Sequence, residues 1–327
     1  MSDCLVIGGG VIGMMSARFL ALAGAKVTLL DQRECGKESS WAGGGIVSPL
    51  YPWHYDDLTN ELSFESQALY QNLCQELFES SGIDPEYLHS GLLMVDQFDT
   101  PEAKAWMKRY QVDYQSHEKG ALFNKIASVR NPRLLQALKA DIINHGVNII
   151  ENTSVQELIT KNNKVLGVRT KVRDFFANNV VLSAGAWSSQ LRQLSETVFP
   201  MKGQMIIFKP SQVKLKPIIL DQGRYIVPRA DGKILAGSTM EDVGFDRMLD
   251  ESTKQSLYEF ACEHLPMLEG VEIEKQWSGF RPATRSSGVI IGRDKHYQNL
   301  FINTGHFRNG INMAPASAIR ITNLINE

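Results

Sequence analysis

A two-part α/β fold, with one parallel and one antiparallel sheet, is predicted by three observations. The chain begins with an apolar strand that runs into a glycine-rich turn and a helix, which is typical of a parallel sheet. A second apolar strand ends in a small-residue turn near residue 182. Between residues 201 and 276 short strands and hairpin turns dominate, which indicates a separate antiparallel sheet. Both ends of the chain therefore belong to the first part, and the second part is inserted between them.

The first thirty residues contain the most specific motif. Residues 5–7 form a strand, residues 26–30 form a second strand that ends at Asp31, and between them stand three glycines with the spacing G-x-G-x-x-G, namely Gly8, Gly10 and Gly13. These glycines permit a tight turn, close approach of the backbone to a pyrophosphate, and close packing of helix on strand. The helix N-terminus offers free N–H groups to phosphates, and Asp31 can accept hydrogen bonds from a ribose hydroxyl. This order predicts a Rossmann-like dinucleotide site, with a purely structural turn as the alternative, and it does not separate NAD from FAD.

Composition limits the classes of partner. The 327 residues are enough for two domains, and 43% hydrophobic with 21% charged residues is ordinary for a globular protein. A formal net charge of -2, without a long basic block, argues against nucleic acid or an anionic membrane as a partner. No run approaches the roughly 18 consecutive apolar residues of a membrane span. We therefore expect small-molecule chemistry.

The cysteine pattern indicates the compartment. Cys4, Cys35, Cys74 and Cys262 are scattered, without a C-x-x-C pair or a cluster with histidine. Neither a disulfide framework nor a metal site is expected from such spacing. The apolar N-terminus lacks the basic segment of a signal peptide and ends in the glycine turn. The prediction is a reduced, cytoplasmic protein.

Three further segments are predicted to contact the same ligand as the glycine turn. Residues 39–46 are small and glycine-rich, so their backbone can press against a flat ligand, with a flexible surface loop as the alternative. Residues 183–188 follow a strand at 180–182 and lie at the carboxyl edge of the parallel sheet, where ligands of open α/β folds bind. Residues 304–311 form a similar turn before the final helix. The aromatic segment 50–55 either roofs a site or belongs to the core.

The other elements organise the rest of the chain. Helices are predicted at about residues 57–80, from residue 100, at 131–146 and at 252–264, with strands at 91–95, 147–150, 155–160, 165–170, 225–228, 234–237, 289–291 and 300–303. The strands from residue 147 onward predict a β-meander. The first of these helices is expected to bury a leucine stripe made of Leu62, Leu69, Leu73 and Leu77. The predicted domains are a discontinuous first domain, residues 1–82, 130–200 and 277–327, and an inserted second domain, residues 83–129 and 201–276.

Six blocks spread from end to end make the whole chain resemble a known family. They are residues 8–13 with Asp31, 39–45, 183–187, 237–239 with 244–246, 277–282 and 305–311. In this order they are similar to the FAD-dependent amine and amino-acid oxidases of the D-amino-acid oxidase superfamily, and most closely to the glycine oxidases that serve thiamine biosynthesis. The resemblance implies a Rossmann-like FAD-binding domain of the glutathione-reductase type with an inserted antiparallel-sheet substrate domain.

The resemblance also implies FAD as the cofactor, held without a covalent link, since no cysteine stands in the carboxyl-terminal blocks. It places residues 43–46 near the isoalloxazine ring and the turn at 305–311 at the pyrimidine end, where a helix N-terminus favours the negative charge of a reduced flavin. The implied cofactor-binding residues are Gly8, Gly10, Val11, Ile12, Gly13, Asp31, Gln32, Ser39, Ser40, Ala42, Gly43, Gly44, Gly45, Ile46, Val155, Ser183, Ala184, Gly185, Trp187, Gly305, His306, Arg308, Asn309, Gly310 and Ile311.

Three residues are implied at the substrate. Arg281 resembles the arginine that binds the substrate carboxylate, Tyr225 the tyrosine whose hydroxyl supports that carboxylate, and Arg308 a second cation near the site. A guanidinium can hold a planar carboxylate with two parallel hydrogen bonds, which fixes the Cα–H bond over the flavin. The alternatives are a structural ion pair for Arg281 and an ordinary half-buried strand position for Tyr225. His306 is expected to be a neighbour of the turn or of the flavin rather than a proton carrier.

The implied activity is oxidative deamination of glycine, sarcosine or a small D-amino acid by hydride transfer to the flavin. It gives an imine, then an oxo acid, ammonia and, with oxygen as the acceptor, hydrogen peroxide; in a cell that makes thiamine the imine would feed thiazole assembly. The alternatives are a D-amino-acid dehydrogenase that passes electrons to a quinone and a flavoprotein subunit without turnover of its own. A homo-oligomer is expected.

One departure from the family concerns residues 285–289. Many glycine oxidases carry an aspartate and then a proline in this loop, whereas this chain reads Arg-Ser-Ser-Gly-Val. The loop beside the flavin is therefore expected to differ, and the preference among glycine, sarcosine and small D-amino acids stays open.

Overall fold

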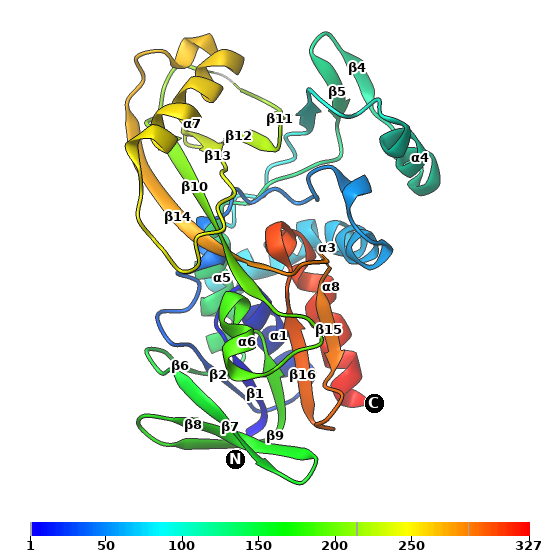
Figure 1. Ribbon diagram of the computed structural model, residues 1–327, viewed down its shortest axis with the longest axis vertical. Coiled ribbons are helices and arrows are strands. Elements are labelled where there is room, and N and C mark those ends of the chain that lie inside the picture. Colours follow the sequence, from blue (N-terminus) through cyan, green and yellow to red (C-terminus); the bar gives the residue numbers. More distant parts are fainter. Residues whose placement is uncertain (1, 214, 287) are drawn as a thin grey trace.

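The first of two sheets is mainly parallel and lies in the lower half of Figure 1, in a computed structural model that describes residues 2–213, 215–286 and 288–327. Its strand order is β15-β16-β9-β1-β2-β6. The bounds are β1 (Ser2–Ile7), β2 (Val27–Leu30), β6 (Asn148–Ile150), β9 (Asp174–Leu182), β15 (Ile290–Arg293) and β16 (Leu300–Thr304). All neighbours run parallel except β15, which is antiparallel to β16.

The two faces of this sheet are covered by different layers because side chains alternate along β1. Cys4 and Val6 pack into a cluster with the helices, whereas Leu5 and Ile7 pack toward a β-meander. The helices are α1 (Val11–Leu22), α3 (Asp57–Ser81), α5 (Asn131–Asn144) and α8 (Gly310–Asn326). The meander consists of β7 (Val155–Lys161), β8 (Lys164–Thr170) and β9. The predicted strand at 147–150 is not part of it, because β6 pairs in parallel with β2 instead.

The second sheet occupies the upper half of Figure 1 and has the order β14-β10-β13-β12-β11-β3-β5-β4. The bounds are β3 (Leu92–Met94), β4 (Gln115–His117), β5 (Gly120–Phe123), β10 (Phe199–Phe208), β11 (Ile218–Asp221), β12 (Arg224–Pro228), β13 (Ile234–Gly237) and β14 (Ile273–Ala283). Neighbours are antiparallel except for β11 and β3, which run parallel. The predicted two-sheet α/β fold is thus confirmed.

Two helices accompany the second sheet. In α7 (Glu251–His264), Leu257 and Phe260 pack on β10 and β13, and in α4 (Pro101–Tyr110), Ala103 and Met107 pack on the cluster that contains β3 and β5. The remaining helices are short: α2 (Ser39–Ala42), α6 (Ser188–Leu191) and the 3-10 helices η1 (Pro52–His54), η2 (Gly185–Trp187), η3 (Pro266–Leu268) and η4 (Phe307–Asn309). Among the described residues, no helix combines the length and the apolar character needed to cross a membrane.

The long strands β10 and β14 connect the two halves (Figure 1). They pair from Phe199 with Ala283 to Phe208 with Ile273, so they run from the middle of the molecule to its far end. The predicted domain boundaries at 200/201 and 276/277 fall inside these two strands. The division into two domains stays a prediction, and residues 277–283, assigned to the first domain, pair within the second sheet.

The long helix α3 differs from the predicted leucine stripe at one position. Leu62, Leu73 and Leu77 are buried, but Leu69 is 37% exposed. Tyr70 occupies the core position next to Leu69 and is fully buried. Core positions 62, 66, 70, 73 and 77 follow the helical repeat, which leaves residue 69 on the outer edge of the buried face.

Candidate active site

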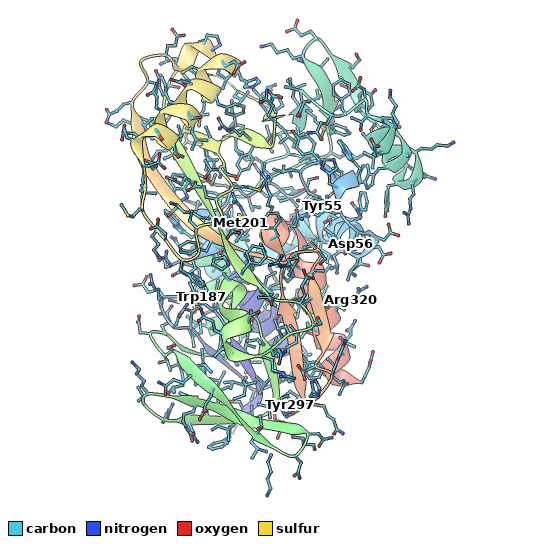
Figure 2. The ribbon with its side chains drawn as sticks, viewed as in Figure 1. Tyr55, Asp56, Trp187, Met201, Tyr297 and Arg320 are labelled. Atoms are coloured by element: carbon cyan, nitrogen blue, oxygen red, sulfur yellow. The ribbon has the colours of Figure 1, made fainter. Side chains whose placement is uncertain are left out.

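Three strand ends form one wall of the candidate site. Ile7 of β1 is in register with Leu30 of β2 and with Leu182 of β9. The turns that follow these strands therefore meet at one edge of the parallel sheet, as expected for a ligand site in this kind of fold. A cavity of about 1630 Å³, its opening included, is lined by Asp31 from this edge and by Arg281 from the second sheet. Trp187, which also lines it, lies at the level where the two halves meet (Figure 2).

We call the part of the cavity lined by Gly8, Gly10, Asp31 and Ser183 the nucleotide end. Gly8 has a φ of +105°, and a Cβ there would lie 2.4 Å from the carbonyl oxygen of Ser183. Gly10, with Val11 and Ile12 after it, brings the first turn of α1 to the cavity wall, where helix N–H groups and the positive end of the helix dipole favour phosphate. The residues present thus fit a dinucleotide.

Asp31 is hydrogen-bonded to the glycine turn. Its Oδ2 accepts a hydrogen bond from the Gly9 N–H at 2.6 Å, and its Oδ1 accepts one from the Arg33 N–H at 2.7 Å. Burial raises the pKa of the carboxyl above its ordinary value, and these two hydrogen bonds oppose the rise. Each oxygen keeps a further lone pair, so the predicted hydrogen bond to a ribose hydroxyl is compatible with the geometry.

The small-residue segment 39–46 is built into the fold and is not a flexible loop. The Val11 N–H donates to Ser40 Oγ at 2.9 Å, and Asn131 Nδ2 donates to the Ser40 carbonyl at 2.6 Å. The buried guanidinium of Arg229 donates to the Gly44 carbonyl at 2.9 Å. Its first four residues form the short helix α2. Its backbone is thereby fixed along the cavity wall.

We call the part lined by Tyr225, Arg281 and Arg308 the substrate end. Arg281 comes from β14 and extends over β10, where a Cβ on Gly203 would lie 2.3 Å from Nη1. Its Nη1 donates to the Thr239 carbonyl at 3.0 Å, and its Nη2 donates to Ser238 Oγ at 2.6 Å. Only a residue without a side chain at position 203 leaves room for this arrangement.

The charge of Arg281 has no carboxylate partner among the described residues. Burial, and then the neighbouring charge of Arg308, lower the pKa of the guanidinium to about 10, so it is still protonated at neutral pH. A buried cation without a counter-ion is unfavourable unless a ligand supplies the negative charge. The structural ion pair considered for Arg281 is therefore absent from the described part of the chain, and the geometry suits an anion.

Tyr225 and Arg308 lie beside Arg281. Tyr225 on β12 is 6% exposed, its ring packs against Gly44, and its hydroxyl lies 3.7 Å from the weak acceptor Met205 Sδ and beside the Arg281 guanidinium. Arg308 in η4 donates through Nη2 to the Gly223 carbonyl at 2.7 Å. The structure thus brings together the three residues that sequence reasoning placed at the substrate, from three distant segments.

His306 lines the cavity but is held neutral. It is 2% exposed, its Nε2 lies 3.0 Å from Ser317 Oγ, and its Nδ1 has no hydrogen-bond partner within the described part of the chain. Burial lowers its pKa from 6.5 to about 3. A ring with this pKa does not exchange protons near neutral pH, which agrees with a place beside the turn.

Most of the predicted cofactor-binding residues line the cavity, and three do not. Those that line it are Gly8, Gly10, Val11, Ile12, Asp31, Gln32, Ser39, Ser40, Ala42, Gly43, Gly44, Gly45, Ile46, Val155, Ser183, Ala184, Gly185, Trp187, His306, Arg308, Gly310 and Ile311. Gly13 lies under α1, where a Cβ would be 1.8 Å from the Gly8 carbonyl oxygen. Gly305 faces Thr284, and Asn309 is buried behind the turn. The contribution of these three residues to cofactor binding stays a prediction.

Other residues that line the cavity were not singled out as cofactor-binding or substrate residues, although some of them lie in segments predicted to contact the ligand. They are Ile7, Leu30, Glu38, Ser48, Leu50, Thr153, Ser154, Gln190, Leu191, Gly203, Met205, Gly279, Pro282, Asn303, Thr304 and Phe307. Asn303 and Thr304 lie at the end of the strand β16 and could have been found by the rule that places ligands at the carboxyl ends of parallel strands. Gly279 belongs to the block 277–282, whereas no local pattern marks Gly203 and Met205 on β10.

Two predicted features lie at the margin of the cavity. In the aromatic segment 50–55, Leu50 lines the cavity, Tyr51 is buried, and Trp53 packs against Trp106, so the segment serves mainly as core. In the loop 285–289, the Ser286 N–H donates to Glu196 Oε1 at 2.6 Å, and none of its described residues lines the cavity. Residue 287 lies outside the described residues.

Comparison with known proteins agrees with this geometry. The chain matches the family described as FAD dependent oxidoreductase over residues 3–324. It is 40% identical to glycine oxidase of Pseudomonas putida, over 98% of this chain and 93% of that protein. It is 32% identical to the bifunctional protein ThiO/ThiG of Trichormus variabilis, over 99% of this chain and 53% of that protein. The crystal structure of glycine oxidase from Bacillus cereus superposes with a TM-score of 0.91 at 28% identity, covering 100% of this chain and 97% of that one.

The resemblance inferred from the six sequence blocks is confirmed by these matches. The prediction of an enzyme that uses FAD is confirmed as well. FAD, and not NAD, is therefore the dinucleotide that the nucleotide end fits. The chain belongs to the FAD-dependent oxidoreductase family.

Proposed function

We propose that the protein oxidises glycine, or a similar small amino acid such as sarcosine or a small D-amino acid, and that Arg281 binds the carboxylate of this substrate. The observation that carries the proposal is the partly buried guanidinium of Arg281, which lines the cavity without a carboxylate partner in the described chain. The likeness to glycine oxidases of Pseudomonas putida and Bacillus cereus supports the choice of substrate.

The donors at the substrate end suit a carboxylate. A guanidinium has five N–H groups, and Arg281 uses two of them on Thr239 and Ser238, so others remain for a ligand. The Tyr225 hydroxyl lies beside Arg281 and has only a weak acceptor in Met205 Sδ, so it can donate to the same carboxylate. Arg308 adds a second positive charge. These groups fix the carboxylate and thereby orient the Cα–H bond of the substrate.

The chemistry at Cα requires little from the chain beyond this orientation. When bound, FAD supplies the acceptor for the two electrons of the Cα–H bond. The overall reaction is glycine with oxygen and water giving glyoxylate, ammonia and hydrogen peroxide, in which the amino acid is oxidised and oxygen is reduced by two electrons. His306 stays neutral and is not needed as a base.

The proposal extends to the role in the cell. Thiamine biosynthesis, with the imine feeding thiazole assembly, is supported by the resemblance of the sequence blocks and by the match to the ThiO/ThiG protein. The cytoplasmic location and the homo-oligomeric state stay predictions.

The test is anaerobic titration of the purified yellow protein with glycine, sarcosine and D-alanine, followed by admission of air and an assay for peroxide. Bleaching by glycine followed by peroxide release is the expected result. Bleaching that is reversed only by an added quinone would favour the D-amino-acid dehydrogenase instead. Absence of bleaching by every amino acid would overturn the proposal in favour of a flavoprotein without turnover of its own.

A further inference from the structure

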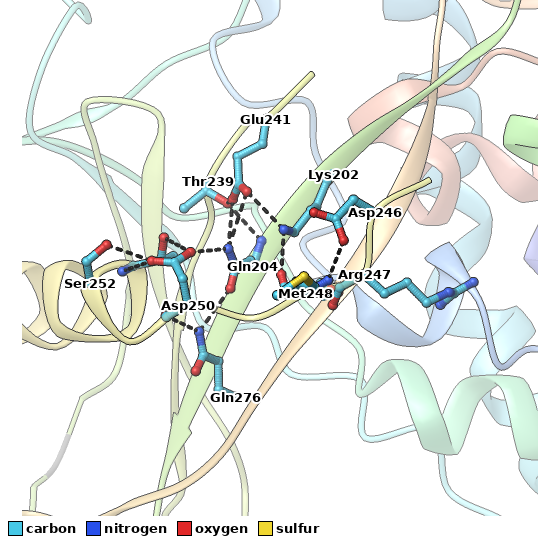
Figure 3. A network of polar contacts seen from close by, with 12 residues as sticks. Lys202, Gln204, Thr239, Glu241, Asp246, Arg247, Met248, Asp250, Ser252 and Gln276 are labelled. Carbon is cyan, nitrogen blue, oxygen red and sulfur yellow. Dashed lines mark hydrogen bonds and ion pairs between the residues drawn. The ribbon is translucent and has the colours of Figure 1, made fainter. Parts of the chain in front are cut away.

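A polar network lies directly behind Arg281 and touches no predicted site residue other than that arginine. It consists of Lys202, Gln204, Thr239, Glu241 and Asp250, which come from β10, from the segment after β13 and from the start of α7 (Figure 3). We call these five residues the Glu241 network. Its link to the substrate end is Thr239, whose carbonyl accepts the hydrogen bond from Arg281 Nη1 at 3.0 Å.

Thr239 is fixed by two hydrogen bonds to β10 and one to Glu241. Its N–H donates to the Gln204 carbonyl at 3.3 Å, and its Oγ1 accepts from the Gln204 N–H at 2.9 Å. The same hydroxyl donates its proton to Glu241 Oε1. All three leave the Thr239 carbonyl free for Arg281, so its direction is set by the network.

Glu241 is bound on both its main chain and its side chain. Its N–H and carbonyl exchange hydrogen bonds of 3.0 Å with the carbonyl and N–H of Lys202. Its carboxylate accepts from Gln204 Nε2 at 3.0 Å and lies 3.2 Å from Lys202 Nζ. Lys202 and Gln204 flank Gly203, the residue over which Arg281 extends. The same group of residues therefore holds the Thr239 carbonyl, which accepts from Arg281, and Gly203, over which the Arg281 guanidinium lies.

The charge of Glu241 is balanced by Lys202 within the network. Burial raises the pKa of Glu241, but the hydrogen bonds from Thr239, Gln204 and Lys202 outweigh this and lower it below its ordinary value, so the carboxylate is ionised. Lys202, which is 4% exposed, pairs with this carboxylate and donates its remaining hydrogen bond to the Met248 carbonyl at 2.5 Å. Glu241 is thus occupied by its own donors, and the charge of Arg281 stays available to a ligand.

We propose that Glu241, acting with Lys202 and Gln204, is a positioning residue for Arg281: it holds the Thr239 carbonyl so that one edge of the guanidinium is bound and the other faces the substrate carboxylate. The inference rests on the proposed function, in which Arg281 binds that carboxylate. It assigns Glu241 no contact with the substrate.

The test uses the FAD-loaded enzyme and glycolate, a carboxylate that lacks the amino group. The dissociation constant of glycolate is measured by isothermal titration calorimetry in the wild type, in Glu241→Gln, in Arg281→Met and in the double variant. We expect Glu241→Gln to raise the constant roughly three- to tenfold, as for residues in one hydrogen-bond network. In the Arg281→Met background the same change is expected to have no further effect, and with glycine the KM of Glu241→Gln rises while kcat changes little.

The chain offers a matched control at the other end of β10. Lys209 and Glu272 repeat the arrangement of Lys202 and Glu241, with an N–H to carbonyl hydrogen bond of 3.0 Å and an ion pair of 2.5 Å, but both side chains are exposed. Glu272→Gln is expected to leave the glycolate constant unchanged. If Glu241→Gln does not retain FAD, Thr239→Val serves instead, because it removes the hydroxyl contacts and keeps the carbonyl.

The outcomes separate the inference from the function on which it rests. An unchanged glycolate constant in Arg281→Met would overturn the proposed function and the inference with it. Weaker binding in Arg281→Met but not in Glu241→Gln or Thr239→Val would overturn the inference alone. Equal weakening by Glu241→Gln in the wild-type and Arg281→Met backgrounds would mean a general structural effect and would also overturn it.

Discussion

The two ends of the cavity are built in different ways. At the nucleotide end, Gly8, Asp31 and Ser183 each follow directly after a strand of one parallel sheet, and the main chain forms most of the wall. At the substrate end, Arg281 reaches across from β14 to lie over Gly203 on β10. Local sequence therefore determines the first end, whereas the second depends on how distant strands align. The two ends should respond differently to substitution.

The largest effect is expected from Gly13→Ala at the nucleotide end. Alanine would favour helix α1 by about 1 kcal/mol. Its methyl group, however, would lie 1.8 Å from the Gly8 carbonyl oxygen. Since backbone has to move, we expect a net loss of stability of about 2 kcal/mol and loss of most bound FAD. The ratio of flavin to protein absorbance and the midpoint of thermal unfolding measure both.

Gly24→Ala is the control for this prediction. Gly24 has a φ of +89°, but no atom lies within 4 Å of the added Cβ. Alanine there costs about 1–2 kcal/mol through its left-handed backbone alone. FAD content should stay near that of the wild type. Full FAD content in Gly13→Ala would show that the close contact of helix and turn is not needed for the nucleotide end.

The next largest effect is expected from Arg281→Lys at the substrate end. Lysine keeps the positive charge but cannot offer two parallel N–H groups to a carboxylate. We expect kcat/KM for glycine to fall about 30- to 5000-fold, corresponding to the roughly 2–5 kcal/mol cost of disrupting a buried, hydrogen-bonded charge pair. FAD content should be retained, because Arg281 belongs to the second sheet. Steady-state peroxide release with a flavin assay on the same sample measures both, and an unchanged kcat/KM would remove Arg281 from the site.

The sequence predicted the nucleotide end of the cavity better than the substrate end. The glycine turn, Asp31 and the turn at Ser183 could be placed because strand, turn and helix follow one another within about thirty residues. Arg281, Tyr225 and Arg308 were reached through the family resemblance, and their proximity is a result of the fold. Gly203 carried no signal, since its role depends on the pairing of Met201 with Arg281 and its neighbours across β10 and β14.

The fold shows the same limit. The helices α3 and α5 were predicted from apolar spacing and caps, because both signals are local. The parallel pairing of β11 with β3 was not predicted: a strand was predicted at 91–95, where β3 lies, but none at residues 218–221 of β11. Strand partners separated by more than a hundred residues are chosen by packing and register, which a single sequence does not display. The Glu241 network was invisible for the same reason.

A pH scan tests whether protonation of the buried His306 side chain affects the free energy of unfolding rather than ligand binding. Its pKa is about 3 in the folded protein and near 6.5 when unfolded. Above pH 6.5 both states are neutral; below it only the unfolded state binds the proton, so the free energy of unfolding falls by up to about 1.4 kcal/mol per pH unit. Glycolate affinity, in contrast, should change little between pH 6 and 8, because neither His306 nor Arg281 titrates there.

The measurement is urea unfolding of the wild type and of His306→Asn from pH 8 to pH 5. The variant should lose less stability on acidification, because asparagine takes up no proton. Its deficit relative to the wild type at pH 8 should therefore shrink toward pH 5. Parallel curves would contradict the assignment of a neutral, buried imidazole.

The smallest effect is expected from Tyr51→Phe, which acts on Arg308 through the main chain. The Tyr51 hydroxyl accepts from the Gly223 N–H at 3.0 Å and donates to Asp96 Oδ1 at 2.5 Å, and the Gly223 carbonyl accepts from Arg308. Loss of the hydroxyl should cost about 1 kcal/mol, seen as a rise of a few-fold in the KM for glycine with kcat and FAD content unchanged. Tyr110→Phe, which removes an exposed hydrogen bond to Asp57, is the matched control. A KM equal to that of the wild type would mean that the turn holds Arg308 without help from the Tyr51 hydroxyl. The position of Arg308 at the substrate end would then depend on the main chain and not on this side-chain contact.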